Sequence, residues 1–462
     1  MQGQLSIGTT DGSGKEVLHI GFDDTDSVRG KCTTHIAFKI TEYLLKNRYA
    51  EFLDYPLLIR LNPNVPWKTR GNGAVCLRLG TNVCQKIIEY VKQTVEQESD
   101  LENGANPAIV FLYGRQIPEE VSEFSNIAMF DVLTRRKAEE IARKYNIQCF
   151  AYGNGQGLVG ALAAIGCLLH EDHTYEAIAY RRTENCGTAR KVDVCNVIKY
   201  SHQTFPNTFN NYDPYHKRIL ITPHGPDPIF CGIRGEDPEI VVSSLEGLHQ
   251  EENLDGYMVF RSNQGTNMHL RNEWKLSDIR AYLSGYLRCR VSTKPSIIEG
   301  GHVMFTVKDS TTIELPAAVY SPTDMTSVAS QLEIGDSIEI GVGVKEATSR
   351  YPETLNVEYL CILMLAHVHQ AHNPCCVFCN KRMKSEGRKK GFQCRNCGYK
   401  DRKIEKINVP MNRNIKLGLY LPAQKSQRHL TKPMHRYGME KHNGILNSDS
   451  KLFPRWFFSS SF

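Results

Sequence analysis

The sequence predicts a multidomain α+β protein that ends in a small β-barrel, a zinc ribbon and a basic C-terminal segment. Three observations support this prediction. Apolar runs of strand length alternate with helical patterns over residues 17–245, short β-rich runs follow at 285–368, and two Cys-x-x-Cys pairs come next. A chain of 462 residues has room for about three or four domains.

The N-terminal part is predicted to alternate strands and helices. The apolar run at 17–22 predicts a buried strand over 17–23, and the apolar positions after Thr33 predict a helix near 33–47. The same patterns predict further strands near 56–61, 73–79, 108–113, 147–152 and 175–181, and helices near 81–97, 135–145 and 157–170.

The β-rich region and the cysteine pairs predict two smaller units. The runs between 285 and 368 have the lengths and glycine content of a barrel of about five strands, such as an OB-fold. Two knuckles separated by 14 residues then supply four thiolates for a closed, structural Zn²⁺ site: Cys376, Cys379, Cys394 and Cys397. Most other cysteines, of 15 in total, stand singly in apolar contexts and are predicted to be reduced core thiols.

The charge of the chain is unevenly distributed. From Lys381 to Lys441 there are 18 Lys and Arg against 4 Asp and Glu, although the whole chain carries only +6. A basic segment on an acidic remainder predicts a nucleic-acid partner. A solvated tail is the alternative, but the segment contains many residues that favour packing: Ile415, Leu417, Leu419, Tyr420, Leu421, Trp456, Phe457 and Phe458.

The sequence gives no sign of export or of a membrane segment. The first residues lack a basic region followed by an apolar stretch, and the longest apolar run, 157–169, is too short and too glycine-rich to span a bilayer. We therefore expect a cytoplasmic protein with no membrane association, and nothing in the sequence implies a protein partner.

Three carboxylates, Asp23, Asp24 and Asp26, follow the first predicted strand, and the Thr33 hydroxyl follows the next turn. Carboxylates this close repel one another unless a cation neutralises them, and Mg²⁺ is typically held by one or two carboxylates plus substrate phosphates. The cluster therefore predicts ATP chemistry through acid-bound metal, because no Walker A sequence is present. An ordinary polar turn is the alternative.

The geometry of a strand limits how these acids can act. Asp24 and Asp26 share one face of an extended strand, whereas Asp23 points to the other face. All three converge only if the chain turns at this point. Otherwise Asp24 and Asp26 hold Mg²⁺ and Asp23 has a supporting role.

Two loops are candidates for phosphate recognition. The run 153–160, which includes Gly155 and Gly157, either contacts phosphate with bare amides or allows a tight crossing of strand and helix. Nicotinamide binding is disfavoured because the next strand ends in arginines rather than an acid. The other loop carries Arg60, Lys68 and Arg70, which suit phosphate or ribose unless they are merely solvated.

Three further stretches, 180–190, 222–235 and 262–269, are rich in Gly, Pro and polar residues. Loops of this composition carry function more often than linkers do. Their candidate substrate-contacting residues are Arg190, Arg234, Asn263 and Gln264. The residues alone do not assign a chemistry to them.

The combined motifs resemble those of the archaeal tRNA-modifying enzymes that form agmatidine, the isoleucine-tRNA 2-agmatinylcytidine synthetases. The resemblance covers nearly all of the chain after residue 15. It rests on Gly-Phe-Asp-Asp-Thr-Asp-Ser at 21–27, Cys-Thr-Thr at 32–34, Arg-Leu-Asn-Pro-Asn-Val-Pro-Trp-Lys-Thr-Arg-Gly-Asn-Gly at 60–73, Gly-Asn-Gly-Gln-Gly-Leu-Val-Gly-Ala-Leu-Ala-Ala-Ile-Gly at 153–166 and Ser-Asn-Gln-Gly-Thr at 262–266. Two positions depart from the expected pattern, because Cys186 replaces a tryptophan and Asn267 replaces an acid.

The resemblance implies a division of the chain. It predicts an atypical kinase-like catalytic domain, a ferredoxin-like domain with associated loops, an OB-fold, a zinc ribbon and a basic C-terminal segment. The expected bounds are 16–130, 131–284, 285–369, 370–408 and 409–462, and the first two units are expected to interleave.

The resemblance also implies a reaction and its partners. The expected enzyme is an ATP-dependent ligase that replaces the C2 oxygen of the wobble cytidine of isoleucine tRNA, anticodon CAU, by agmatine, with ATP ending as AMP. Asp23, Asp24 and Asp26 would be the metal-binding acids, and Thr33 the threonine that becomes phosphorylated. The cofactors are ATP, Mg²⁺ and structural Zn²⁺. The alternative is a single-stranded nucleic-acid-binding protein without catalysis, which explains residues 285–442 but leaves 17–270 without a role.

Overall fold

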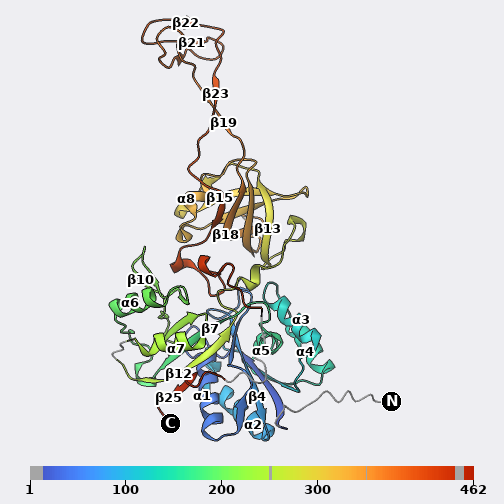
Figure 1. Ribbon diagram of the computed structural model, residues 1–462. Helices are drawn as coiled ribbons and strands as arrows, with labels where there is room; N and C mark the ends of the chain where they lie inside the picture. Colours follow the sequence, from blue (N-terminus) through green and yellow to red (C-terminus); the bar gives the residue numbers. More distant parts are fainter. Residues whose placement is uncertain (1–13, 249–251, 350, 443–451) are drawn as a thin grey trace.

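The computed structural model describes residues 14–248, 252–349, 351–442 and 452–462. The protein has three parts that follow one another in space (Figure 1). A large α/β body is followed by a β-barrel, and a small cysteine-containing unit projects beyond the barrel on a two-stranded stalk. The predicted mixed α/β architecture is thereby confirmed.

One sheet of 11 strands organises the body. Its main path runs β6-β5-β1-β4-β3-β12-β7-β11-β8, with β2 paired to β4 and β25 paired to β12. The strands, in that order, are β6 (Gln148–Ala151), β5 (Ala108–Tyr113), β1 (Glu16–Asp23), β4 (Gly73–Thr81), β3 (Leu57–Arg60), β12 (Leu254–Ser262), β7 (Thr174–Arg181), β11 (Ile229–Gly235), β8 (Thr208–Phe209), β2 (Ala50–Phe52) and β25 (Phe457–Ser459). All five strands predicted after the first one are present.

The two predicted N-terminal units share this sheet. They join where β3 pairs in parallel with β12, with Leu57 opposite Arg261 and Leu58 opposite Ser262. The sheet therefore brings the end of β1 and the loop after β3 close to segments much later in the chain. The predicted boundary at residue 130 stays a prediction.

Helices cover both faces of the sheet and enclose two apolar cores. Buried residues of α1 (Thr33–Lys46), α2 (Cys84–Glu98), α6 (Val194–Thr204) and α7 (Pro238–Glu246) belong to one core. Those of α3 (Glu119–Ala128), α4 (Arg135–Lys144) and α5 (Gly157–Gly166) belong to the other. Helices α1, α2, α4 and α5 lie where the sequence predicts them, although α5 ends at Gly166 instead of residue 170. Helices α3, α6 and α7 were not predicted.

The predicted five-stranded barrel is confirmed. Strand β13 (Ser284–Val291) pairs with both β15 (Val303–Lys308) and β17 (Ser337–Lys345), which closes the barrel. The circuit is completed through β16 (Glu314–Val319) and β18 (Thr354–Met364), and the short helix α8 (Thr326–Ala329) lies between β16 and β17 in the chain. β14 (Ser296–Ile297) and β24 (Gly418–Tyr420) pair with barrel strands from outside this circuit.

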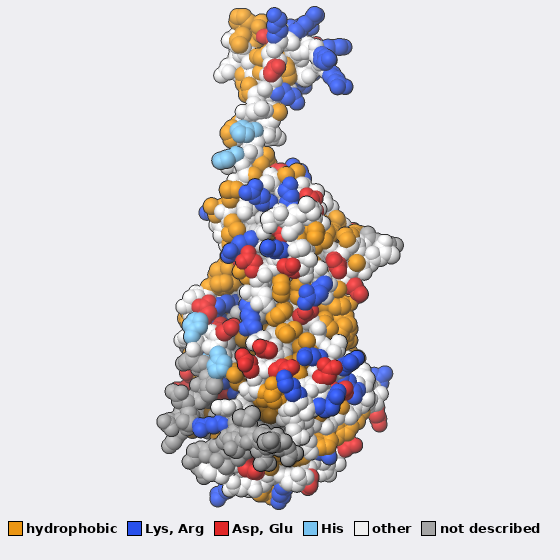
Figure 2. All heavy atoms as spheres, turned by 90° about the vertical axis from the view of Figure 1, so that its right-hand side faces the viewer, with side chains coloured by type: hydrophobic (Ala, Val, Ile, Leu, Met, Phe, Trp, Pro, Cys, Tyr) orange, Lys and Arg blue, Asp and Glu red, His pale blue; other side chains and the backbone are white. Residues whose placement is uncertain are grey.

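The cysteine-containing unit is small and projects from the barrel. Its stalk pairs β19 (His369–His372) with β23 (Ile407–Pro410), and three two-residue strands, β20 (Lys384–Ser385), β21 (Phe392–Gln393) and β22 (Lys400–Asp401), form its sheet. Only four residues form its buried apolar cluster: Cys376, Met383, Phe392 and Cys394. Figure 2 shows Lys and Arg side chains gathered on its surface.

The C-terminal segment packs against the body, as its aromatic residues predict. Strand β25 pairs with β12, and Trp456, only 8% exposed, contacts the rings of Phe52 and Tyr55. Leu417 and Phe458, in contrast, are exposed. No helix in the described ranges is long and apolar enough to cross a membrane.

Several basic residues of this segment form internal ion pairs instead of a free basic surface. Arg436 is fully buried and pairs with Asp172 at 3.0 Å and with Glu236. Arg413 makes two hydrogen bonds to Asp336, at 2.6 and 3.0 Å. The charge count of the sequence therefore overstates the positive charge that this segment presents to a partner.

Candidate active site

A cavity of about 580 Å³ lies in the body where its two halves meet. Its walls come from the end of β1, the start of α1, the loop 61–73, the start of α5 and the loop 220–229. A residue of the C-terminal segment, His429, completes the lining. The cavity thus depends on segments that are far apart in the chain.

The three carboxylates after β1 all line this cavity. Strand β1 ends at Asp23, and Asp24 has a φ of 57°, in the left-handed region, so the chain turns between them. This turn lets Asp23 line the cavity together with Asp24 and Asp26. Burial and the neighbouring carboxylates raise the pKa of Asp23 to about 8, and burial raises the pKa of Asp26 to about 6.

Within the described residues, the four cysteines are the only group of three or more potential metal ligands whose ligand atoms converge. The three aspartates therefore do not form a complete metal cage by themselves. Two carboxylates with phosphate oxygens and water are a normal Mg²⁺ environment, and the repulsion among these acids suits a bound cation. The donor set thus fits Mg²⁺ bound together with a phosphate-containing substrate.

Two helices begin at the cavity wall. Thr33 and Thr34 are the first residues of α1, and Gly157 and Gly160 lie in the first turns of α5. Helix N-termini present free N–H groups and partial positive charge, which favours phosphate. The Thr33 hydroxyl is buried and accepts a hydrogen bond from Thr25 at 3.0 Å.

The glycines of α5 permit a very close approach of this helix to β1. A Cβ at Gly160 would lie 1.8 Å from Oδ2 of Asp23, and one at Gly157 would lie 2.6 Å from the Asp23 carbonyl oxygen. This geometry corresponds to the tight crossing that was one of the two alternatives, and Gly157 also lines the cavity. Gly155, with a φ of 70°, does not line the cavity and instead leaves room for Arg135.

All three predicted cations of the loop after β3 line the cavity. Arg60 is partly buried, and this burial lowers the pKa of its guanidinium, while Gly71 and Gly73 leave space for its Nη1. Its Nε is buried and has no hydrogen-bond partner among the described residues. Lys68 donates to the Val65 carbonyl at 3.3 Å.

Arg70 joins the acid cluster to the other half of the body. Its guanidinium donates to the carbonyls of Ser27 and Gly30, both at 2.9 Å. It also lies 3.5 Å from Asp26 and 3.5 Å from Asp227, a buried carboxylate of the loop after β10 (Arg218–Ile219). Asp26, Arg70 and Asp227 therefore form a row of alternating charges along the cavity wall.

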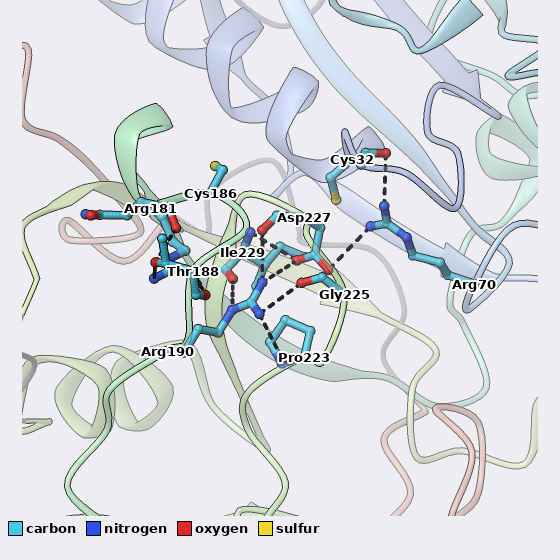
Figure 3. Close-up of polar contacts among 12 residues, drawn as sticks. Cys32, Arg70, Arg181, Cys186, Thr188, Arg190, Pro223, Gly225, Asp227 and Ile229 are labelled. Carbon is cyan, nitrogen blue, oxygen red and sulfur yellow. Dashed lines mark hydrogen bonds and ion pairs between the residues drawn. The ribbon is translucent and has the colours of Figure 1, made fainter. Parts of the chain in front are cut away.

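Arg190, which was predicted to contact substrate, does not line the cavity. It holds the loop 220–229 in place through hydrogen bonds (Figure 3). Its guanidinium donates to the carbonyls of Pro223, Gly225, Asp227 and Ile229 at 2.7–3.0 Å and pairs with the Asp227 carboxylate at 3.2 Å. Arg190 thus fixes Asp227, and Asp227 in turn faces Arg70.

The other predicted loop residues have two different placements. Arg234 lines the cavity, where it pairs with Glu176 at 3.2 Å and donates to His429 at 2.8 Å. Gln264 is fully buried behind them and donates to Glu176. Asn263, also fully buried, accepts from the Arg60 N–H and donates to the Arg60 carbonyl, both at 2.8 Å, so it fixes β3.

The cavity lining also includes residues that were not predicted as site residues, among them Glu176, Asp227 and His429. Glu176 lies inside a fully buried strand, which was a signal because a buried acid needs a partner. Asp227 stands within a Pro- and Gly-rich loop, where aspartate is common. His429 reaches the cavity only because the C-terminal segment folds back, and no local pattern indicates that.

Asn267, one of the two departures from the family pattern, has a clear structural role. Its φ of 56° suits asparagine, and its side chain donates to the Tyr437 hydroxyl at 3.1 Å and accepts from the Lys432 N–H at 2.8 Å. It therefore anchors the C-terminal segment to the body. Cys186, the other departure, lies in a loop and does not line the cavity.

The four knuckle cysteines converge as predicted. Their sulfur atoms all lie within 4.8 Å of one another, with Cys376 and Cys379 facing Cys397 and Cys394 at 3.4 Å. Four cysteines in this arrangement suit a tetrahedral Zn²⁺ site. Cys375 is exposed and outside the group.

Comparison with known proteins now gives the family. Residues 19–154 match the TiaS TCKD domain, 155–269 the TiaS FLD domain and 373–415 the TiaS C-terminal zinc ribbon domain. The isoleucine-tRNA 2-agmatinylcytidine synthetase TiaS of Cenarchaeum symbiosum is 42% identical over 424 residues, which cover 91% of this chain and 93% of that protein. The chain belongs to the TiaS family.

Other TiaS proteins match over nearly their whole length. The relative from Methanosarcina mazei is 37% identical, with 90% of this chain and 97% of that protein covered. The crystal structure of TiaS in complex with isoleucine tRNA and ATP aligns with a TM-score of 0.82 at 33% identity. The crystal structure of the complex with isoleucine tRNA, AMPCPP and agmatine aligns with 0.79 at 31%. Both alignments cover 91% of this chain and 97% of the other.

Proposed function

We propose that the protein is an ATP-dependent ligase that joins agmatine to the wobble cytidine of the isoleucine tRNA with anticodon CAU. One observation carries this proposal: the chain aligns over 91% of its length with TiaS structures that contain isoleucine tRNA, ATP or its analogue, and agmatine. The cavity supports it, because acids suited to Mg²⁺, two helix N-termini and several arginines face one space.

The reaction needs an activated oxygen. The C2 oxygen of cytosine is a poor leaving group, and transfer of a phosphoryl group from ATP converts it into one that departs as phosphate. The agmatine amine then attacks C2, so that a C–N bond forms, the C–O bond breaks and the amine loses a proton. The resemblance implies that ATP ends as AMP, so a second phosphoanhydride bond also breaks, and its phosphoryl group passes to the Thr33 hydroxyl or to water.

We assign the cavity residues to this chemistry by position. Asp24 and Asp26 would hold Mg²⁺ and Asp23 would support them, and Mg²⁺ neutralises charge on the transferred phosphoryl group. Arg60, Lys68, Arg70 and the start of α5 would bind phosphates. Thr33, at the start of α1, would be the threonine that becomes phosphorylated.

The remaining parts fit recognition of RNA. The barrel circuit β13-β15-β16-β18-β17 supports an OB-fold, which is a five-stranded barrel that commonly binds nucleic acid. Zn²⁺ held by Cys376, Cys379, Cys394 and Cys397 would stabilise the ribbon, which carries exposed Lys and Arg. We also propose the kinase-like and ferredoxin-like assignments and the cytoplasmic location, which stay predictions.

One incubation tests the proposal. Purified protein is mixed with the isoleucine tRNA transcript, ATP and agmatine, and the RNA is digested and weighed by mass spectrometry. We expect one cytidine to gain the mass of agmatine less water and AMP to appear. A transcript with uridine at the wobble position is the control. Tight binding of the tRNA without mass gain would favour a nucleic-acid-binding protein without catalysis.

A further inference from the structure

A second, smaller hollow of about 240 Å³ adjoins the cavity. We call it the basic groove. One wall is formed by the segment 424–429. The other wall is formed by Asn210 and by the stretch from Arg218, in β10, to His224. The C-terminal segment that contributes the first wall runs between the body and the barrel (Figure 1).

Positive charge dominates the lining of this groove. Arg218, Arg234, Lys425 and Arg428 all line it, together with two histidines, and no Asp or Glu does within the described chain. Carboxylates that pair with three of these cations reach them from outside the lining: Glu176 to Arg234, Asp324 to Lys425 at 3.8 Å and Glu358 to Arg428 at 3.2 Å.

Arg218 differs from the other three cations. It is exposed, and in the described part of the chain it takes part in no ion pair. Its guanidinium donates to Nε2 of His224, so this imidazole acts as an acceptor while other guanidinium N–H groups stay available. The groove therefore offers an uncompensated arginine next to its partly compensated neighbours.

The groove lies directly beside the candidate active site. Four residues line both spaces: Leu220, Thr222, Arg234 and His429. A polymer that occupies the groove can therefore place its next monomer in the cavity. Agmatine, a dication at neutral pH, is disfavoured by this lining, whereas a polyanion is favoured.

We propose that the basic groove binds backbone phosphates of the RNA beside the target cytidine, so that this cytidine enters the cavity. The proposal rests on the proposed function. Three amide side chains, Asn210, Gln424 and Gln427, also line the groove and suit ribose hydroxyls or base edges of single-stranded RNA. A nucleotide of an unpaired loop is splayed out at low cost, which allows the backbone to follow the groove.

Arg218→Gln and Lys425→Gln test the proposal, and Lys46→Gln is the matched control. Lys46 is exposed in the last turn of α1, outside both lined spaces. Fluorescence anisotropy with the labelled isoleucine tRNA is measured over a series of KCl concentrations. We expect each groove variant to bind roughly ten-fold more weakly, and the slope of log Kd against log[salt] to fall by about 0.7. The Lys46→Gln control should keep the wild-type tRNA affinity and salt slope. The KM for ATP should not change in any of the three variants.

Two results would overturn the proposal. One is tRNA affinity and salt slope equal to those of Lys46→Gln in both variants. The other is a raised KM for ATP with unchanged tRNA affinity, which would show that the groove binds nucleotide phosphates. If the wild-type protein makes no agmatine adduct, the proposed function fails separately, and the binding data still decide whether the groove holds RNA.

An RNA probe with neutral linkages tests the proposal on the wild-type protein, so the result does not depend on whether the variants fold. An anticodon stem-loop with methylphosphonate linkages on either side of the target cytidine is compared with the normal stem-loop on wild-type protein. We expect roughly ten-fold weaker binding of the neutral probe and a smaller difference for Arg218→Gln. Equal binding of the two probes by the wild-type protein contradicts the proposal.

Discussion

The active-site cavity and the cysteine-containing ribbon are held together by opposite means. The cavity lies in a body with two large apolar cores, and its charges are fixed by buried networks such as Arg190–Asp227 and Arg234–Glu176. The ribbon has four buried residues in its core, two of which are the thiols Cys376 and Cys394. A core of this size provides little hydrophobic stabilisation.

This difference separates chemistry from recognition. The body can hold repelling carboxylates together because the surrounding packing fixes them in place. We expect the ribbon to need a bound metal to fold, because its core is so small, and it projects from the barrel on a two-stranded stalk. Changes at the acid cluster of the body should therefore alter catalysis, whereas changes in the ribbon should alter RNA binding.

The largest effect is expected at the acid cluster. Asp24→Asn and Asp26→Asn remove charges that would hold Mg²⁺, and agmatine transfer should fall by at least about 10³-fold. The affinity for tRNA should stay within about two-fold, since the ribbon, the barrel and the basic groove are unchanged. Glu102→Gln, at an exposed carboxylate outside the cavity, is the control. Full activity of both aspartate variants would show that the assigned site is wrong.

Loss of zinc should affect the ribbon alone. In Cys394→Ser a ligand is missing, so the ribbon should unfold and tRNA affinity should fall on the order of 10–100-fold. ATP affinity and the melting temperature of the body should not change. Cys375→Ser is the matched control, because Cys375 is adjacent but outside the ligand group. Equal losses of tRNA and ATP binding would contradict the separation of roles.

Gly160→Ala tests the close approach of α5 to β1. Its new Cβ would meet the Asp23 carboxylate, so we expect a loss of about 1–3 kcal/mol in the free energy of unfolding together with a larger loss of activity. Gly247→Ala is the control, since its Cβ would come no closer than 3.3 Å to the Ser243 carbonyl. Urea unfolding measures the stability of both variants. A stable, fully active Gly160→Ala would show that α5 can shift freely.

A smaller effect concerns acid stability of the body. Burial and Arg78 lower the pKa of His19 to about 3, so the folded protein keeps this imidazole neutral while the unfolded chain protonates it below about pH 6.5. The unfolded state then binds more protons, and the free energy of unfolding falls as the pH falls through this window, by roughly 1 kcal/mol per pH unit. His19→Gln should reduce this slope.

The control for that measurement is His202→Gln. His202 is exposed on α6, so its variant should keep the wild-type pH profile in urea unfolding followed by circular dichroism. Identical slopes for the two variants would mean that His19 is not protected from protonation. Because the ribbon holds no comparable buried histidine among its described residues, the slope reports on the body.

Local sequence patterns predicted some residues of the candidate site and missed others. The acids after β1 and the cations after β3 were predicted, because each stands directly after an apolar strand or inside a stiff loop that a local pattern reveals. Arg190 and Asn263 were predicted to contact substrate, but neither lines the cavity, and their contacts with backbone carbonyls and with Arg60 depend on distant segments. Asp227 and His429 lie in the site only through those distant contacts.

The sequence by itself determined most strands and helices of the first half, the barrel, the four-cysteine cluster and the acid cluster, because periodicity and spacing are local properties. The tertiary structure decided that one sheet joins both halves and that Asp23 turns toward its neighbours. It also decided that the basic C-terminal segment uses part of its charge in ion pairs with Asp172, Glu236 and Asp336. These outcomes depend on pairing between residues far apart in the chain, and burial of a charge becomes visible only when its partner is placed beside it.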